Sequence, residues 1–182
     1  EVGNYERALY NYQLAKGMDS GNKEAIFGMG KTYIQKGNIE NAKSMLKENF
    51  SGDMLIESNL LLSYIEAIND SEKAKSIVKD IEPGDEWREV YTEWNSVLAN
   101  LDTDVLFNGT KLGKHYIDSG SSYLVVALLE PNIENMGEYI DGIYILGKAY
   151  YEHGEYDKSI QLLENSTSLS DLNQYIYWVL AR

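Results

Sequence analysis

The sequence predicts an all-α protein made of stacked helix-turn-helix hairpins, with no β-sheet. Two observations predict this fold class. Apolar residues recur with the period of an α-helix through most of the chain, and a ten-residue segment occurs three times, at residues 28–37, 111–120 and 145–154. Each copy holds a Gly-Lys pair, a tyrosine two residues after the lysine and a glycine four residues later. Such repetition indicates an array in which each hairpin buries its apolar face against its neighbours.

The first elements follow from the spacing of apolar and small residues. Residues 4–18 read as one outer helix without its partner in a hairpin. The next helix shows the i, i+3, i+4, i+7 pattern of one helical face, carried by Ile26, Met29, Gly30 and Tyr33. Gly37 and Asn38 break it, and a second helix follows with Ile39, Ala42, Lys43 and Leu46. Because Gly30 and Ala42 have almost no side chain, we expect these two helices to approach closely.

The last hairpin repeats this design. A helix ends at Gly154, and the next helix carries Tyr156, Ser159, Ile160 and Leu163 at helical spacing. Residues 172–182 read as a further inner helix without its partner. We expect the repeated tyrosines to be substantially buried between helices, each beside its own glycine: Tyr33, Tyr116 and Tyr150. Replacing Gly147 by a bulky residue is expected to cost about 1–3 kcal/mol by overpacking a close helix contact.

The spacing of the tyrosines predicts an additional helix near the middle of the chain. With Tyr64 as a degenerate marker between Tyr33 and Tyr116, the steps up to Tyr150 are 31, 52 and 34 residues. The long step exceeds one repeat by about a helix and a turn. This surplus falls in residues 86–101, where a wide apolar stripe follows the helical period. The preceding Glu-Pro-Gly-Asp is a turn signal whose aspartate would be the N-cap. The alternative is a degenerate repeat whose second helix is long or shifted.

We therefore divide the chain into three parts. Residues 1–85 form a first sub-array of a half repeat and about two repeats, and residues 86–102 form an extra or irregular helix. Residues 103–182 form a second sub-array of two repeats and the start of another. The final helix is apolar, whereas a terminal repeat normally carries a polar cap. We expect the chain to be a piece of a larger protein.

Charge and composition exclude several function classes. The chain has 16 Lys and Arg against 29 Asp and Glu, a formal net charge of -13, which argues against binding nucleic acid or anionic lipid. Without cysteine and with two histidines, it lacks the usual ligands for zinc and the usual members of a catalytic triad. No apolar run reaches the roughly 18 residues that span a bilayer. We expect no catalytic residues, cofactor, metal or membrane insertion, and the compartment stays open between the cytoplasm and the cell envelope.

Two motifs that resemble functional sites have simpler explanations. Residues 25–32 match a relaxed phosphate-loop pattern, but a polar loop precedes them, whereas a phosphate loop connects a strand to a helix. His115 and His153 have no other ligand residues close by in the sequence. We interpret both as surface or capping histidines, with a partly charged His153 at a helix end where it favours the helix dipole.

The repeated segment resembles the tetratricopeptide repeat, whose signature is W-x2-L-G-x2-Y, then A-x3-F, then P over 34 residues. Three copies match it: Ile26, Met29, Gly30, Tyr33, Ala42 and Leu46; Gly109, Leu112, Gly113, Tyr116, Val125 and Leu129; Ile143, Leu146, Gly147, Tyr150, Ser159 and Leu163. No tryptophan fills the first place, prolines are misplaced or absent, and Gly109 lacks the large side chain expected there. The Leu-Gly-x-x-Tyr core is similar to that of Sel1-like repeats, whose longer spacing fits less well. The resemblance implies a right-handed α-α superhelix of stacked hairpins.

The resemblance also implies a partner-binding groove, because in this family the first helix of each hairpin lines a concave surface. One lysine per clear repeat follows the packing glycine and is turned about 100° from the core stripe. The candidate groove residues are Phe27, Lys31, Ile34, Thr110, Lys114, Ile117, Tyr144, Lys148 and Tyr151. Lysines among aromatic residues suit an acidic or carboxylate-ended peptide, although the family's Lys/Asn/Arg carboxylate clamp has no match. The alternative is that these lysines are solvated helix surface.

The sequence thus predicts a non-enzymatic scaffold that binds another protein or an extended peptide in its groove. Stacked hairpins present a large preorganised surface, which suits recognition more than chemistry. Two alternatives stay open. In the first, the array is an accessory region that positions the catalytic domain of a larger enzyme or belongs to a cell-envelope secretion or assembly machine. In the second, the chain self-associates, with the uncapped ends or the tryptophan-containing helix at residues 86–101 pairing between copies.

Overall fold

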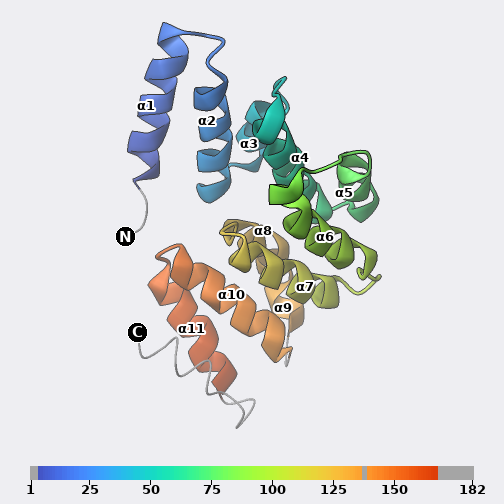
Figure 1. The fold of residues 1–182 in the computed structure, drawn as a ribbon. Helices are drawn as coiled ribbons and strands as arrows, with labels where there is room; N and C mark the ends of the chain where they lie inside the picture. Colours follow the sequence, from blue (N-terminus) through green and yellow to red (C-terminus); the bar gives the residue numbers. More distant parts are fainter. Residues whose placement is uncertain (1–3, 137–138, 168–182) are drawn as a thin grey trace. The chain divides into compact units, whose positions relative to one another are not determined.

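The fold is helical throughout the part of the chain that can be described. The computed structural model describes residues 4–136 and 139–167, and these residues form helices and turns without any strand (Figure 1). The all-α prediction is confirmed. The helix predicted at residues 172–182 lies outside the described residues.

The chain forms two compact units that divide between Asn100 and Leu101. The first unit contains α1 (Tyr5–Met18), α2 (Lys23–Gln35), α3 (Ile39–Leu46), α4 (Gly52–Ala67), α5 (Ser71–Val78) and α6 (Asp85–Ala99). The second unit contains α7 (Val105–Asp118), α8 (Tyr123–Leu129), the 3-10 turn η1 (Glu130–Asn132), α9 (Ile133–Met136), α10 (Ile140–Glu152) and α11 (Tyr156–Thr167). Pro131 in η1 ends the apolar run of α8, because proline cannot continue its hydrogen bonding.

Short polar caps and glycine turns set the hairpin boundaries. Asn22 accepts a hydrogen bond from the Ala25 amide at 2.8 Å at the start of α2, and Asp104 caps the amides of Leu106 and Phe107 at the start of α7. The first helix of three hairpins ends in a glycine with positive φ: Gly37, Gly120 and Gly154. These glycines favour the left-handed conformation that turns the chain back.

The repeated tyrosines complete these turns through their backbone. In each hairpin the amide after the glycine donates to the tyrosine carbonyl five residues earlier: Asn38 to Tyr33 at 2.9 Å, Ser121 to Tyr116 at 2.6 Å, and Glu155 to Tyr150 at 2.9 Å. This is the hydrogen bond that closes a Schellman motif. The spacing between the tyrosine and the glycine in the sequence therefore follows from the geometry of one helix end.

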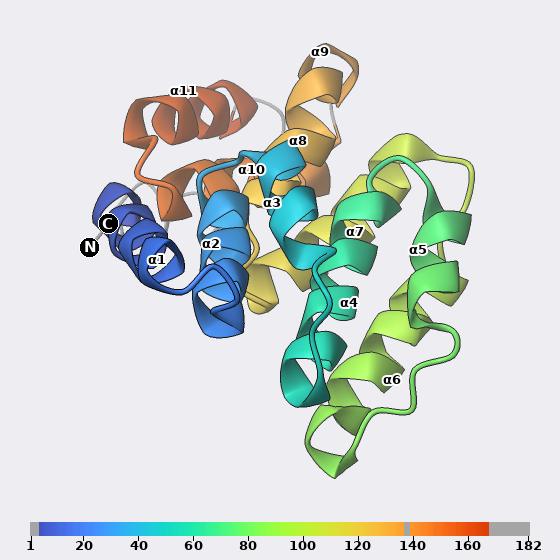
Figure 2. The same cartoon turned by 90° about the horizontal axis from the view of Figure 1, so that it is seen from above.

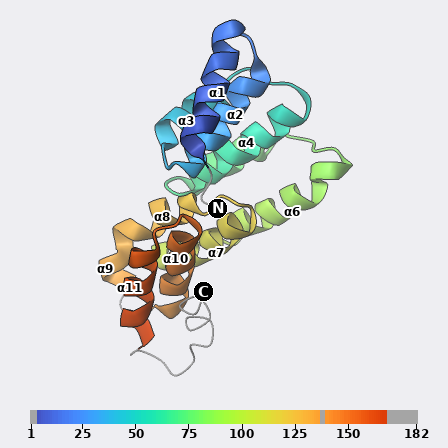
Figure 3. The same ribbon diagram turned by 90° about the vertical axis from the view of Figure 1, so that its left-hand side faces the viewer.

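The packing glycines allow close helix contacts, as predicted. A Cβ atom on Gly30 would lie 2.9 Å from Leu46 Cδ2, and one on Gly147 would lie 2.6 Å from Leu163 Cδ2. Figure 3 shows α10 beside α11, the hairpin that holds the second contact. In the α7/α8 hairpin, Leu129 fills the space beside Gly109, so the missing large side chain is replaced from the second helix. Tyr116 and Tyr150 are buried, and Tyr33 is partly buried.

The helix α6 is a separate element that packs on α4 and α5 (Figure 2). The preceding α5 has only eight residues, so the second helix of this repeat is not long, and a shifted second helix stays an alternative prediction. Trp94 of α6 is fully buried, and its Nε1 donates to Ser63 Oγ of α4 at 2.8 Å. The Tyr91 hydroxyl donates to the Ile56 carbonyl at 2.9 Å. The N-cap is Gly84, and Asp85 is the first helical residue.

Candidate functional site

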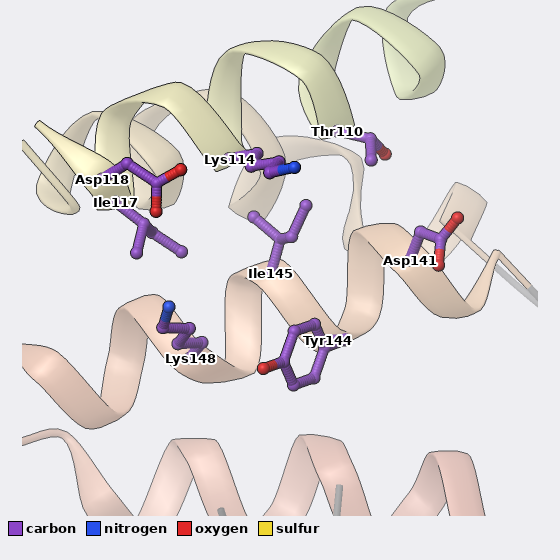
Figure 4. Close-up of a pocket in the computed structure, with 8 residues that line it drawn as sticks. All are labelled: Thr110, Lys114, Ile117, Asp118, Asp141, Tyr144, Ile145 and Lys148. Atoms are coloured by element: carbon purple, nitrogen blue, oxygen red, sulfur yellow. The ribbon is translucent and has the colours of Figure 1, made fainter. Parts of the chain in front are cut away.

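The second unit has a pocket between the first helices of its two hairpins, α7 and α10. Its volume is about 330 Å³, and it is open to solvent. Six of the lining residues are Thr110, Lys114, Ile117, Tyr144, Ile145 and Lys148 (Figure 4). All of these except Ile145 are candidate groove residues predicted from the sequence. Two acidic residues, Asp118 and Asp141, complete the lining. The structure therefore brings together five of the nine candidate groove residues.

The floor of this pocket is apolar, and helix packing holds it in place. Ile145 is buried and contacts the backbone of α7 at Gly113, where an added Cβ would lie 2.6 Å from Ile145 Cγ2. Ile117 and Tyr144 are partly buried on either side. Thr110 Oγ1 lies 3.1 Å from the Tyr139 hydroxyl, a hydrogen bond that ties α7 to the start of α10. An apolar floor beneath exposed polar groups is the usual composition of a ligand-binding cleft.

The rim of the pocket carries charges of both signs. Lys114 is exposed and Lys148 partly exposed, and neither forms an ion pair within 4 Å with a residue that the structure describes. Asp118 and Asp141 lie toward opposite ends of the pocket in Figure 4. The prediction from sequence missed both aspartates, although each lies three or four residues from a candidate groove residue on the same helix, the spacing of one helical face.

The candidate groove residues of the first unit have a different environment. Lys31 Nζ lies 2.6 Å from Glu57 Oε1 and 5.4 Å from the centroid of the Phe27 ring. Phe27 is largely buried against Phe50, and Ile34 is 2% exposed. The prediction that Ile34 lines a groove was wrong, because α2 is covered by α1 as well as by α3. Lys31 lines a pocket of its own unit, so a single strip of three lysines remains a prediction.

Tyr151 lies outside the α7/α10 pocket as well. Its ring is partly buried, and the centroid lies 5.5 Å from that of Tyr156. The contact joins α10 to the start of α11. Tyr151 therefore contributes to the packing of its own hairpin, and no observed contact links it to the α7/α10 pocket.

The two histidines are more buried than expected. His115 is 6% exposed, so its interpretation as a surface residue was wrong, and it belongs to the core of the second unit. His153 does cap α10, and its Nε2 lies 3.2 Å from Ser122 Oγ. Burial beside the Tyr123 ring lowers the pKa of His153, although the charge of Glu155 opposes the shift. A partly charged cap was therefore the wrong expectation, since burial favours the neutral imidazole.

The structure also bears on nucleotide, metal and membrane sites. Residues 25–32 lie entirely within α2, so their amides point along a helix and cannot surround a phosphate. Among the residues that the structure describes, no three acidic or histidine side chains gather as metal ligands. No helix in residues 4–136 and 139–167 is long and apolar enough to cross a membrane.

Comparison with known protein families identifies repeats in two segments of the chain. Two family models of the tetratricopeptide repeat match the chain, one at residues 23–48 and the other at residues 141–166. The chain contains tetratricopeptide repeats. The two matches coincide with the hairpins α2/α3 and α10/α11, the elements that carry the packing glycines Gly30 and Gly147. No curated protein and no solved structure matches the chain.

The structure extends the tetratricopeptide pattern beyond the two matched segments. The α7/α8 hairpin lies outside them, but it has the same turn at Gly120 and the same tyrosine carbonyl as acceptor. The α7/α10 pocket thus lies between two hairpins. A family model matches the α10/α11 hairpin, whereas the α7/α8 hairpin is assigned to the repeat by its geometry alone. Neither match describes Sel1-like repeats, so the weaker similarity to those repeats is not supported.

Proposed function

We propose that this tetratricopeptide repeat protein is a non-enzymatic scaffold whose second unit binds an extended segment of another protein in the α7/α10 pocket. Tetratricopeptide repeats in general indicate protein-protein interaction, and the family is generally non-enzymatic. The observation that supports a site at this position is a pair of lysines beside an apolar cavity, Lys114 and Lys148, neither of which forms an ion pair within 4 Å with a described residue. The charge of Glu152 acts on Lys148 alone. The division into two sub-arrays at residues 86–102 is part of the same proposal.

The charges of the pocket define the segment that fits. An apolar side chain of the partner contacts Ile117, Tyr144 and Ile145, where burial contributes roughly 25 cal/mol per Å² of apolar surface. Carboxylates of the partner lie beside Lys114 and Lys148 and form charge-assisted hydrogen bonds with them, although the charge of Glu152 already acts on Lys148. Asp118 and Asp141 repel acidic groups at the two ends of the pocket. The preferred segment therefore has acidic residues close to one central apolar residue.

The test starts from random displayed peptides selected on the intact chain. Selected peptides are expected to share an aliphatic or aromatic residue flanked by Asp or Glu. Their affinity should fall at least ten-fold for the double variant Lys114→Glu/Lys148→Glu, since each reversal replaces an attraction by a repulsion. Lys47→Glu/Lys79→Glu is the matched control, because both lysines are exposed and the net charge changes equally. Equal losses for the two double variants would show that only net charge matters, and the proposed site would then be wrong.

The alternative roles are separated by simple measurements. If the array positions an enzyme, a catalytic domain is expected in the intact gene product, and peptide selection should yield no common motif. If copies of the chain pair with one another, light scattering should show a mass that rises with protein concentration. A concentration-independent mass together with a selected acidic motif supports the scaffold.

A further inference from the structure

The first unit has a pocket of different chemistry between α1, α2 and α4. Its volume is about 500 Å³, enough for a long side chain and part of its backbone. The lining combines aromatic residues with one acidic, one basic and several uncharged residues: Tyr5, Tyr12, Glu24, Phe27, Gly28, Lys31, Thr32, Gln35 and Met54. The two tetratricopeptide matches assign no role to this pocket.

Two tyrosines of α1 form one wall of the pocket. Tyr5 and Tyr12 are separated by two helical turns and therefore lie on the same face of the helix. Tyr12 lies directly against α2 at Gly28, where an added Cβ would overlap its ring. Gly28 therefore allows an aromatic ring to approach the α2 backbone. The faces of such rings attract cations through their quadrupole.

The pocket already binds one cation of the chain itself. The Lys31 ammonium lies between the Phe27 ring, at 5.4 Å from its centroid, and Glu57 Oε1, at 2.6 Å. A ring and a carboxylate together thus compensate one positive charge. Because Glu57 neutralises it, Lys31 is a weak attractant for an acidic partner, in contrast to Lys114 in the second unit.

One carboxylate of the pocket has no such partner. Glu24 is exposed in the first turn of α2, and it forms no ion pair within 4 Å with any residue described by the structure. Glu57 does not line the pocket, but its ion pair with Lys31 compensates the one positive charge of the lining and leaves the negative charge of Glu24 uncompensated. The whole chain, at a net charge of -13, adds a field that attracts basic segments.

We propose that this pocket binds an arginine side chain of a partner protein. The guanidinium lies against the tyrosine wall of α1 and pairs with the Glu24 carboxylate, in the same way that Lys31 lies between Phe27 and Glu57. Arginine is favoured over lysine because its planar group stacks on aromatic rings and pairs with a carboxylate through two hydrogen bonds. The site is independent of the α7/α10 pocket, so either proposal can fail without the other.

The test uses the intact, 15N-labelled chain and two synthetic probes at about 0.15 M salt. The probes are acetyl-Gly-Arg-Gly-Arg-Gly-amide and the same peptide with glutamate in place of arginine. The arginine peptide is expected to cause saturable chemical-shift changes in the amides of α1 and α2, and the glutamate peptide none there. Tighter binding of the glutamate peptide at α2 would overturn the proposal and restore Lys31 as a site for acidic segments.

Matched variants separate this site from general attraction to an acidic protein. Glu24→Gln should weaken the arginine peptide about two- to five-fold, the effect of losing one exposed ion pair. Glu40→Gln is the control, since Glu40 is the likewise exposed second residue of α3, and this substitution should not change the affinity.

Variants of Tyr12 test the aromatic wall. Tyr12→Phe should retain binding of the arginine peptide, and Tyr12→Leu should weaken it. Equal effects of Glu24→Gln and Glu40→Gln, or shifts that do not saturate, would show non-specific attraction only and would overturn the proposal.

Discussion

The α2/α3 and α10/α11 hairpins differ from the α4/α5 hairpin in how their two helices are held together. In the first two, a glycine lies against a leucine of the second helix, and a left-handed glycine forms the turn. In α4/α5, Leu62 stands at the position of the packing glycine, counted back from the second helix. The family models match the first two hairpins and not this one.

The turn of the α4/α5 hairpin is built without glycine. The amides of Asn69 and Asp70 both donate to the Glu66 carbonyl, at 3.1 and 2.8 Å. No non-glycine residue in the described chain has positive φ, so no left-handed residue reverses the chain here. Asp70 then caps α5 by accepting from the Lys73 amide at 2.9 Å. The turn has the same length as those of α2/α3 and α10/α11, but its hydrogen bonds differ.

The α4/α5 hairpin is completed by a third helix. Ser63 Oγ donates to the Ala74 carbonyl of α5 at 2.8 Å and accepts from Trp94 Nε1 of α6 at 2.8 Å. The Trp94 ring meets the Tyr64 ring edge-on, with centroids 4.5 Å apart. This buried network joins three helices where the glycine hairpins join two. The comparison shows that packing of α6 replaces the contact between a glycine and a leucine that the degenerate α4/α5 repeat lacks.

The largest effect is expected from Trp94. Because its side chain is completely buried, Trp94→Ala should lower the free energy of unfolding by about 3–5 kcal/mol. Urea unfolding followed by circular dichroism measures the change. Trp94→Phe keeps a ring beside Tyr64 but loses the hydrogen bond to Ser63, so it should cost less. A loss below about 1 kcal/mol for Trp94→Ala would show that α6 is dispensable and would break the comparison.

A smaller effect is expected from the packing glycine of α10/α11. Gly147→Leu should cost about 1–3 kcal/mol, since any added side chain meets Leu163 Cδ2 at 2.6 Å and Cγ at 2.8 Å. Gly17→Leu is the matched control: a Cβ on Gly17 of α1 meets no atom within 4 Å, and leucine has the higher helix propensity. The same denaturation experiment should show a neutral or stabilising effect for Gly17→Leu. Equal losses of stability at both positions would show that Gly147 is not required for close packing of the two helices.

The smallest effect concerns Glu66 at the end of α4. Burial raises the pKa of the Glu66 carboxyl, but hydrogen bonds and positive charges from Lys73 and Lys43 outweigh burial and lower the pKa below its usual range. The Glu66 oxygens lie 3.0 Å from Lys73 Nζ and 3.2 Å from Lys43 Nζ. A lowered folded pKa stabilises the fold above the unfolded pKa of about 4.3. This contribution is lost as the pH falls through the lowered folded pKa.

Comparison with Glu66→Gln isolates this contribution from the other carboxylates. At pH 7 the wild-type chain should be more stable than the variant by about 1–2 kcal/mol. The difference should shrink toward zero as the pH is lowered through the acidic range. Urea unfolding of both proteins at a series of pH values gives the measurement. A difference that stays constant with pH would show that the Glu66 charge does not stabilise the hairpin.

Local geometry could be predicted from the sequence, and tertiary neighbours could not. The spacing from Tyr150 to Gly154 encodes one helix end, and Gly147 encodes one close contact, so both were predictable. Tyr64 was a misleading marker, since Ile65 holds the equivalent place before α5. Burial of Ile34 depends on the helices on both sides of α2, which the helical period of one helix does not specify.

The candidate site shows the same limit. Lys114 and Lys148 were predictable, because each follows a packing glycine on its own helix. Asp118 and Asp141 belong to the pocket only because α7 and α10 pack against each other. The sequence could have indicated these two aspartates only as charged residues on the side of the helix that faces the groove. That side is defined only when the neighbouring helix is known. The presence of both positive and negative side chains at the rim could therefore be recognised only from the structure.

The central claim, that Lys114 and Lys148 attract and bind an acidic segment, is tested most directly by association kinetics. The association rate of a selected acidic peptide is measured for the wild type and for Lys114→Glu/Lys148→Glu over a range of salt concentrations. The double variant should associate more slowly, with a weaker salt dependence and an unchanged melting temperature, because the lysines act mainly on the encounter. Lys31→Glu should have little effect, since Glu57 already neutralises Lys31. An unchanged rate and salt dependence in the double variant would contradict the account and place the contact elsewhere.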